Sequence, residues 1–360
     1  MVVGIRDMRA LVRLLLLACL ALFTLPTWAA DSSQSAANPD RQPEQVQRQQ
    51  EQPLNNAPVW RDVRAGENPY QTTQVRGIET NVWIQSQGQL WREIRNGPIT
   101  VYGGWLIIGA LLAILAFYLW KGPIKVHGQP TGRKILRFTP WDRTIHWTVA
   151  ISWVILAVSG LILLFGKYIV LPLFGYTLFS WLAILSKNLH NFVGPVFLLA
   201  AALMFFTYLG RNIPRAYDIT WLLKGGGMLT GKHVPSGFFN AGEKIVFWVG
   251  LFLFSIIVGA SGIVLLFPNL DQGRVIMQYA NIVHAITAIL FIAMICGHAY
   301  LGSVGLEGAY HNMRHDGLVD ETWAKEHHEY WYNEVMRGRP GAGGAMSAAR
   351  ASSMEEGWKL

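Results

Sequence analysis

Four histidines lie within or at the ends of long apolar stretches of this chain: His146, His190, His284 and His298. Ionisable side chains are costly inside a membrane and are usually kept there for function. The 360 residues hold ten histidines but only two cysteines, too few for the four thiolates of an iron–sulfur cluster or a cysteine zinc cage. No CxxCH motif for covalently attached haem is present. Any redox or metal centre of the chain is therefore expected on histidine.

The composition places these histidines in a membrane. Hydrophobic residues make up 52% of the chain and charged residues 14%, against about 25% charged in a typical soluble domain. A helix needs about 20 apolar residues to cross the hydrocarbon layer of about 30 Å. Five stretches are long enough and are predicted to be transmembrane helices: residues 99–120, 144–165, 189–209, 245–267 and 277–301.

The connections between the spans predict their orientation. The loops after the first and third spans are rich in Lys and Arg, whereas the opposite loops hold only Lys167, Lys187 and Arg274. Positively charged loops stay in the cytoplasm, so the C-terminus is expected there. The net charge of +8 is accordingly assigned to membrane topology and not to nucleic-acid binding.

The segments outside the spans complete the predicted organisation. Residues 1–29 have the basic start, apolar middle and small-residue end of a secretory signal, with an uncleaved first helix as the alternative. Residues 30–97 are expected in the periplasm as a polar linker and a small segment that packs on a partner. The predicted fold is an all-α integral membrane protein with an extra transmembrane helix (98–121), a four-helix bundle (135–302) and a cytoplasmic tail (303–360).

Helical geometry pairs the four histidines by depth. His284 and His298 are 14 residues apart on the fifth span, so they project from one face and lie about 21 Å apart along the axis. His146 begins the second span at its cytoplasmic end, and His190 begins the third at its periplasmic end. His190 therefore lies at the depth of His284, and His146 at that of His298. Two imidazoles that face each other in a helix bundle can hold a b-type haem, so two haems are predicted.

Other residues in the chain allow two interpretations. Gly160, Gly194, Gly259 and Gly262 lie near the expected haems, where they could admit a flat macrocycle, but glycines alone favour close contact between helices. The remaining histidines are expected to be solvated in loops or to lie on a solvated or subunit-contacting helix of the tail, with a tail zinc site as the alternative. They are His127, His233, His311, His315, His327 and His328.

The residues around the membrane histidines resemble those of the gamma subunit of respiratory formate dehydrogenase, a dihaem cytochrome b. The similarity extends from about Ile135 to Tyr332, and the four histidines coincide with the haem-ligand positions of that family. The first 121 residues look like the N-terminal extension of a longer subgroup. The similarity rests on runs in the same order and spacing: Trp141–Trp147, Leu189–Gly194, Asn240–Lys244, Ile282–Ala285, Gly297–Tyr300 and Trp323–His328.

The resemblance implies a formate:quinone oxidoreductase complex in a bacterial inner membrane. A molybdenum or tungsten alpha subunit would oxidise formate in the periplasm, and an iron–sulfur beta subunit would relay the electrons. This chain would anchor the complex and pass the electrons through the haem on His190 and His284 and the haem on His146 and His298 to menaquinone or ubiquinone. The chain itself would then contain no formate-oxidising site and no catalytic residue.

The resemblance also implies a quinone site beside the cytoplasmic haem, formed by Asn240, Ala241, Gly242 and His298. An amide and a histidine can hydrogen-bond a quinone carbonyl and help to deliver protons. Asn240 is also a favourable N-cap for the apolar helix that follows it. Both roles are compatible.

Three alternatives remain open at the level of the sequence. The chain could be the cytochrome b anchor of a hydrogenase or of another quinone-linked oxidoreductase. A histidine-using transporter would usually show internal repeats and mid-span breaks, whereas no repeat is evident here and the prolines lie mostly at span ends, with Pro195 the exception. A purely structural anchor would leave four membrane histidines without a role.

Overall fold

The computed structural model describes residues 64–65, 86–270 and 272–338, and the elements below all belong to one unit, Trp83–Leu360. Five helical segments in these ranges are long and apolar enough to cross a membrane, which confirms the all-α integral membrane fold. They are Gln87–Lys121, Pro140–Phe165, Val170–Arg211, Ala241–Leu266 and Arg274–Gly305. The predicted signal sequence, most of the polar segment 30–97 and the last 22 residues of the tail lie outside the described residues.

The first span begins earlier than its hydropathy predicts. It comprises α4 (Ser86–Ile94), the π-helical turn η4 (Arg95–Ile99) and α5 (Thr100–Lys121), whereas the apolar stretch begins only at Ile99. Its polar first part is helical because backbone hydrogen bonds continue through polar residues. Pro98, which lacks an N–H, lies within the π-helical turn.

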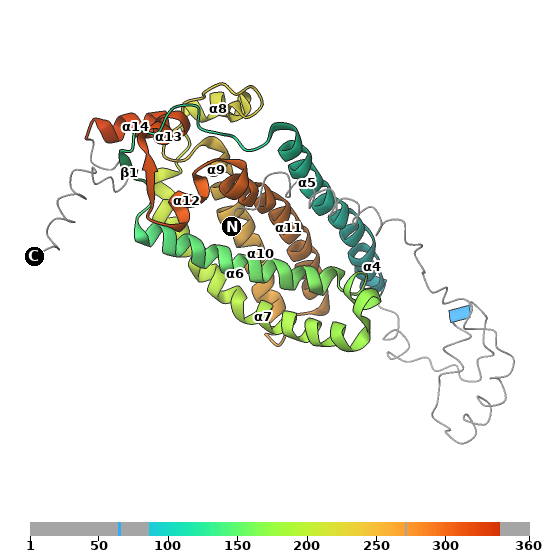
Figure 1. Cartoon of the computed structure of the whole chain (residues 1–360). Coiled ribbons are helices and arrows are strands. Elements are labelled where there is room, and N and C mark those ends of the chain that lie inside the picture. Colours follow the sequence, from blue (N-terminus) through green and yellow to red (C-terminus); the bar gives the residue numbers. More distant parts are fainter. Residues whose placement is uncertain (1–63, 66–85, 271, 339–360) are drawn as a thin grey trace, which may run out of the picture. The chain divides into compact units, whose positions relative to one another are not determined.

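The next two spans form a long hairpin (Figure 1). α6 (Pro140–Phe165) packs along α7 (Val170–Tyr208), in which Gly175 (φ 77°) interrupts the helical backbone. α7 begins 19 residues before the predicted start at Leu189, so His190 lies well inside this helix and not at its end. The prediction of the third span was wrong at this boundary because hydropathy locates the apolar layer and not the last backbone hydrogen bond.

The remaining spans complete a bundle of four helices with a fifth beside it. The fourth span consists of α9 (Ala241–Ile245), the π-helical η7 (Val246–Phe254) and α10 (Ser255–Leu266), and it packs on α11 (Arg274–Tyr300). The extra helix α5 packs on α11 as well, as Figure 1 shows. The side chain of Ile289 lies so close to Gly103 that a Cβ at this position would clash with it. This contact joins the extra helix to the bundle.

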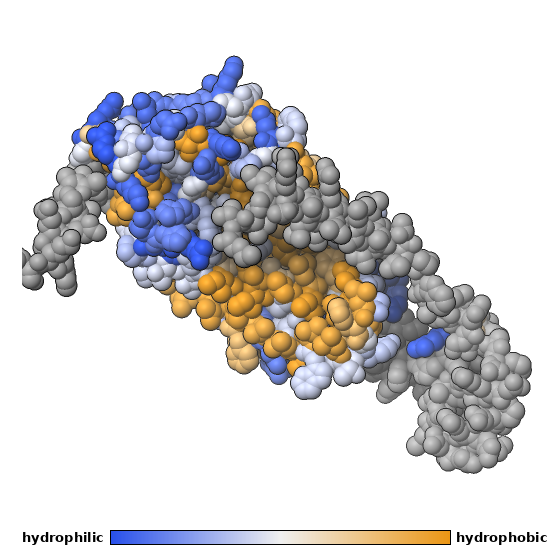
Figure 2. Space-filling view, viewed as in Figure 1, coloured by the Kyte–Doolittle hydropathy of each residue, from blue (hydrophilic) through white to orange (hydrophobic). Residues whose placement is uncertain are grey.

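The surface of the helices suits a lipid environment. Large apolar side chains point outward from α7, where Phe192 is 78% exposed and Phe206 is 73% exposed. In Figure 2 the apolar residues gather over the helices, whereas the polar residues gather over one end. Contiguous exposed apolar surface of this extent is unfavourable in water but is the normal surface of a helix in hydrocarbon.

The C-terminal tail folds back to form a cap at the His146 end of the bundle. The cap consists of two antiparallel strands and three short helices, seen together in Figure 1. Trp331 and His328 are each only 1% exposed within it. The tail supplies α12 (Ala309–Arg314), β2 (Leu318–Asp320), α13 (Glu321–His327) and α14 (Glu329–Met336), whereas β1 (Lys134–Leu136) comes from the connection before α6. The other short elements between the spans are η5 (Leu209–Arg211), α8 (Ala216–Leu223), η6 (Gly225–Gly227) and η8 (Leu301–Gly305).

The expectation of a solvated or subunit-contacting tail helix is wrong for His328. Burial lowers the pKa of His328 well below its ordinary value of 6.5, so the ring is neutral. Its Nδ1 lies 2.8 Å from the carbonyl oxygen of Gly237. The alternative of a zinc site in the tail finds no support, because the described residues contain no group of three or more His, Cys, Asp or Glu side chains that could hold a metal.

Two cations that were assigned to topology also pair with buried carboxylates at the His146 end. Arg211 at the end of the third span lies 3.1 Å from Asp142, whose carboxylate also accepts from the backbone of Thr139 and so caps α6. Lys244 lies 2.7 Å from Asp218, and both side chains are almost completely buried. These pairs connect the polar ends of helices that are far apart in the sequence.

Candidate functional site

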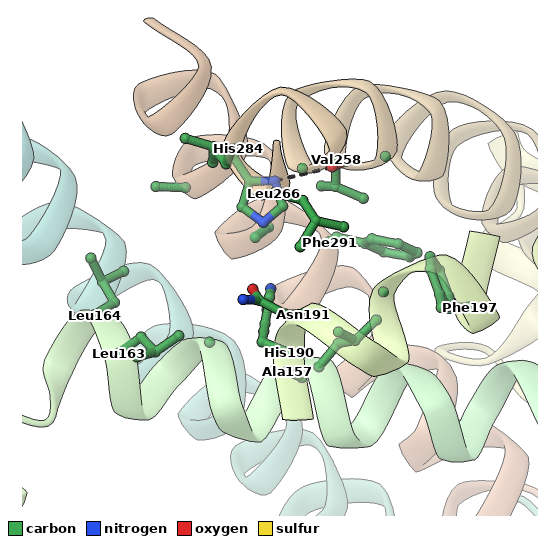
Figure 3. A pocket seen from close by; sticks show the side chains of 18 of the residues that line it. Ala157, Leu163, Leu164, His190, Asn191, Phe197, Val258, Leu266, His284 and Phe291 are labelled. Atoms are coloured by element: carbon green, nitrogen blue, oxygen red, sulfur yellow. Dashed lines mark hydrogen bonds between the residues drawn. The ribbon is translucent and has the colours of Figure 1, made fainter. Parts of the chain in front are cut away.

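His190 on α7 and His284 on α11 face each other inside the bundle (Figure 3). The centres of the two imidazole rings are 5.9 Å apart. A metal ion bound to one nitrogen of each ring, at the usual distance of about 2.0–2.1 Å, needs ring centres about 6 Å apart. The two rings are therefore spaced so that one metal ion could bind a nitrogen of each.

Hydrogen bonds orient both rings. His284 Nδ1 lies 3.0 Å from the carbonyl oxygen of Val258, so this nitrogen carries the proton and donates it. His190 Nδ1 lies 2.9 Å from Ser159 Oγ, and that hydroxyl already donates to the carbonyl of Ile155. The serine oxygen consequently accepts from His190. In both residues the tautomer leaves Nε2 without a proton, which is the state that a metal requires.

A short similarity between the second and fourth spans underlies this arrangement. Residues 159–165 read SGLILLF and residues 261–267 read SGIVLLF, with five of seven positions identical. In each run the serine lies beside the Nδ1 of one histidine, since Ser261 Oγ is 3.2 Å from His284 Nδ1. The glycine that follows lies against the same ring. The two serines were missed by sequence reasoning, and this similarity is the signal that could have identified them.

The four glycines named in the sequence analysis have different surroundings, and only Gly259 makes the close contact between helices that one interpretation predicted. A Cβ on Gly160 would lie 3.4 Å from Cε1 of His190, and a Cβ on Gly262 would lie 3.3 Å from Cε1 of His284, so both make room for a histidine ring. Gly259 instead packs tightly against Leu198, which is a contact between helices. Gly194 has no heavy atom within 4 Å of its Cβ position and borders open space.

A cavity of about 470 Å³ surrounds His190 and His284. Pockets that bind cofactors and other small ligands usually have volumes of about 300–1,000 Å³, and this cavity lies within that range. The lining is mainly apolar, with Phe197 and Phe291 at one side in Figure 3. Polar side chains are few, and they are the two histidines, Arg95, Lys187, Asn191 and Asn281. The opposed ring nitrogens and the apolar walls fit a haem.

His146 and His298 form the second pair of facing rings. Their ring centres are 6.3 Å apart, and they lie on α6 and α11 respectively. His146 Nδ1 is buried without a hydrogen-bond partner among the described residues. Opposed rings at this spacing also fit one iron. The structure thus brings together the same histidines that helical depth paired from the sequence.

Three of the four residues expected at the quinone site, Asn240, Ala241 and Gly242, lie at the start of α9, whereas His298 lies in the last turn of α11. Asn240 is the N-cap of α9, with its Oδ1 accepting from the backbone of Glu243 at 2.9 Å and its own N–H donating to that carboxylate at 2.8 Å. Ala241 is 2% exposed, and Gly242 packs against the ring of Trp221. The N-cap role is therefore observed directly. Glu243 also pairs with buried Arg137 at 3.3 Å.

A membrane bundle of four helices with two opposed histidine pairs defines a membrane cytochrome b as the class of this protein. A family model described as prokaryotic cytochrome b561 matches residues 137–313, a range that includes all four histidines and excludes α4 and α5. That family implies haem b as the cofactor.

Known relatives identify the family more narrowly. The cytochrome b556(fdo) subunit of formate dehydrogenase from Escherichia coli (strain K12) is 31% identical over 212 residues, covering 56% of this chain and 94% of the relative. The nitrate-inducible cytochrome b556(Fdn) subunit from the same strain is 29% identical, covering 57% and 93%. The cytochrome b556 subunit from Haemophilus influenzae is 24% identical, covering 56% and 84%. The chain belongs to the cytochrome b subunits of formate dehydrogenase.

Proposed function

We propose that this chain is the membrane subunit through which a formate dehydrogenase complex reduces quinone, with two b haems in series. The observation that carries the proposal is the presence of two opposed histidine pairs at two depths of one helix bundle. His284 and His298 share α11, so one helix sets the separation of both sites at about 21 Å. Electrons would enter at the His190 end and leave at the His146 end.

The chain's own residues hold and isolate these sites. The imidazoles of His190 and His284 would bind one iron, and those of His146 and His298 the other. Ser159 and the carbonyl of Val258 fix the ring orientation at the first site. The apolar lining of the cavity keeps water away from the bound group. Haem, when bound, supplies reversible one-electron chemistry.

The loop charges support an orientation of the chain in the membrane. The cation-rich loops and the cap lie at the His146 end, and by the positive-inside rule this end would face the cytoplasm, with the chain in a bacterial inner membrane. Negative charge would then move inward while quinone takes protons from the cytoplasm. Each charge that crosses stores about 2.3 kcal/mol per 100 mV of membrane potential.

Formate oxidation itself belongs to a partner. The sequence holds two cysteines, and an iron–sulfur cluster usually requires four thiolates. We therefore assign the iron–sulfur centres to a beta subunit and formate oxidation to a molybdenum or tungsten alpha subunit, both on the periplasmic side. The names of the relatives favour this complex over a hydrogenase.

The haem content of the purified complex tests this function. We expect a dithionite-reduced minus oxidised spectrum with b-type α-bands, and a pyridine haemochrome ratio of about two haems per chain, because each histidine pair would hold one iron. Formate should reduce both haems in the presence of the partner subunits. Folded, detergent-stable protein without haem would exclude the electron-transfer function and favour a transporter.

Variants of Asn240 separate its capping role from a quinone contact. Aspartate caps a helix as well as asparagine, whereas alanine costs about 1 kcal/mol. If Asn240 only caps α9, we expect N240D to reduce quinone at the wild-type rate and N240A to lose thermal stability alone. A quinone contact instead predicts a raised KM for quinone in both variants, because each removes the amide donor. Steady-state assays with a water-soluble quinone analogue measure the difference.

A further inference from the structure

The helix that precedes the four-helix bundle contributes to the wall of the cavity around His190 and His284. Arg95, the first residue of the π-helical turn η4, lines this cavity. Its carbonyl oxygen accepts a hydrogen bond of 2.6 Å from Thr100 Oγ1, which ties the turn to α5. Ile289, which meets Gly103 of α5, lines the cavity from α11.

A polar contact holds α4, the first part of the extra helix, close to His284. Trp91 Nε1 donates to Asn281 Oδ1 at 3.2 Å. Asn281 lies one turn before His284 on α11 and also lines the cavity. The extra helix is thus held on both sides of Arg95 by contacts to residues of the cavity wall. These contacts fix the position of the extra helix relative to His190 and His284.

The cavity carries two cations and no carboxylate. Arg95 and Lys187 are the charged residues of its lining, apart from the histidines. Neither forms an ion pair with a carboxylate of residues 86–270 or 272–338, and Arg95 donates to the side chain of Asn96 at 3.0 Å. Lys187 is exposed and Arg95 half-buried, which places both charges where the cavity meets its surroundings. Lys187 lies three residues before His190, on the same face of α7.

This charge pattern defines the kind of group that the cavity accepts. Apolar walls suit a flat hydrophobic body, and two cations at the opening suit carboxylates attached to it. Guanidinium binds a carboxylate through two parallel hydrogen bonds, and such charge-assisted bonds are about twice as strong as neutral ones. Haem b has this combination of an apolar ring and two propionate side chains.

We propose that Arg95 and Lys187 bind the propionates of the haem held by His190 and His284. The extra N-terminal helix is then a haem-binding element and not only an additional membrane anchor. The inference rests on the proposed function, because it names further residues of the same site. A cation beside the propionates also favours the reduced haem, since reduction adds one negative charge.

Neutralising Arg95 tests this proposal in the purified complex. We expect R95Q to lower the midpoint potential of one haem, the one lost in H284A, while the other stays unchanged. A tenfold shift in the reduction equilibrium corresponds to about 59 mV for one electron. R92Q is the matched control, because Arg92 lies one turn earlier on α4, is exposed and does not line the cavity. Optical redox titration gives both potentials, and pyridine haemochrome gives the haem content.

R95K distinguishes the charge from the shape of the side chain. A potential or haem content closer to wild type in R95K than in R95Q supports the proposal, because lysine keeps the cation. Equal values in R95Q and R92Q, or equal losses in R95Q and R95K, overturn it. Wild-type complex without two haems would instead overturn the proposed function itself, so the two failures are distinguishable.

Discussion

Replacing His284 with alanine is expected to reduce the haem content from about two to about one per chain. The ring of His190 would remain, but α11 would no longer supply a ring nitrogen opposite to it. A b haem has no covalent attachment, so its retention depends on axial ligation and packing. We expect electron transfer from formate to quinone to be lost, while the partner subunits still reduce a soluble artificial acceptor.

The other three membrane histidines offer matched variants for this prediction. H190A should lose the same haem as H284A, whereas H146A and H298A should both lose the other one, which gives two groups with different residual spectra. H311A serves as the control because this side chain is 56% exposed on the cap and is not one of the four membrane histidines. Two unchanged haems in H284A would refute the assignment of the ligands.

Replacing Lys244 with methionine is expected to destabilise the His146 end by about 3–5 kcal/mol, the usual cost of removing one partner of a buried ion pair. The Lys244 ammonium group lies 2.7 Å from Asp218 and also donates to the carbonyl of Ile213 at 3.2 Å. Among the residues that the structure describes, Asp218 Oδ1 has no hydrogen-bond partner, and Oδ2 accepts besides Lys244 only from the backbone N–H of Arg215. Without the cation, Asp218 would be a buried and uncompensated charge.

Thermal unfolding in detergent, followed by tryptophan fluorescence, measures this loss. K232M removes an exposed lysine from the connection that precedes α9 and should leave the midpoint of thermal unfolding unchanged. The double variant D218N/K244M should recover part of the stability, because it removes the unpaired charge while keeping the volume. A K244M midpoint equal to that of K232M would show that the pair contributes nothing measurable.

The membrane spans and the pairing of histidines followed from the sequence because both depend on local geometry. A helix rises a constant distance per residue, so a separation of 14 residues determines both the depth and the face of His284 and His298. The hydrocarbon layer then sets the length of each apolar stretch. His190 was predicted to lie level with His284, and the two rings do face each other, even though the start of its helix was predicted 19 residues too late.

The contacts between distant segments were decided only by the tertiary structure. Ser159 lies 31 residues from the histidine that it orients, and the cap brings His328 onto Gly237 across 91 residues. Arg95 reaches the cavity because α4 and α5 pack on α11. Such contacts depend on how side chains interlock between helices, which neither hydropathy nor periodicity records. The sequence alone therefore determined where the histidines lie in the membrane, whereas packing between helices determined which residues surround them.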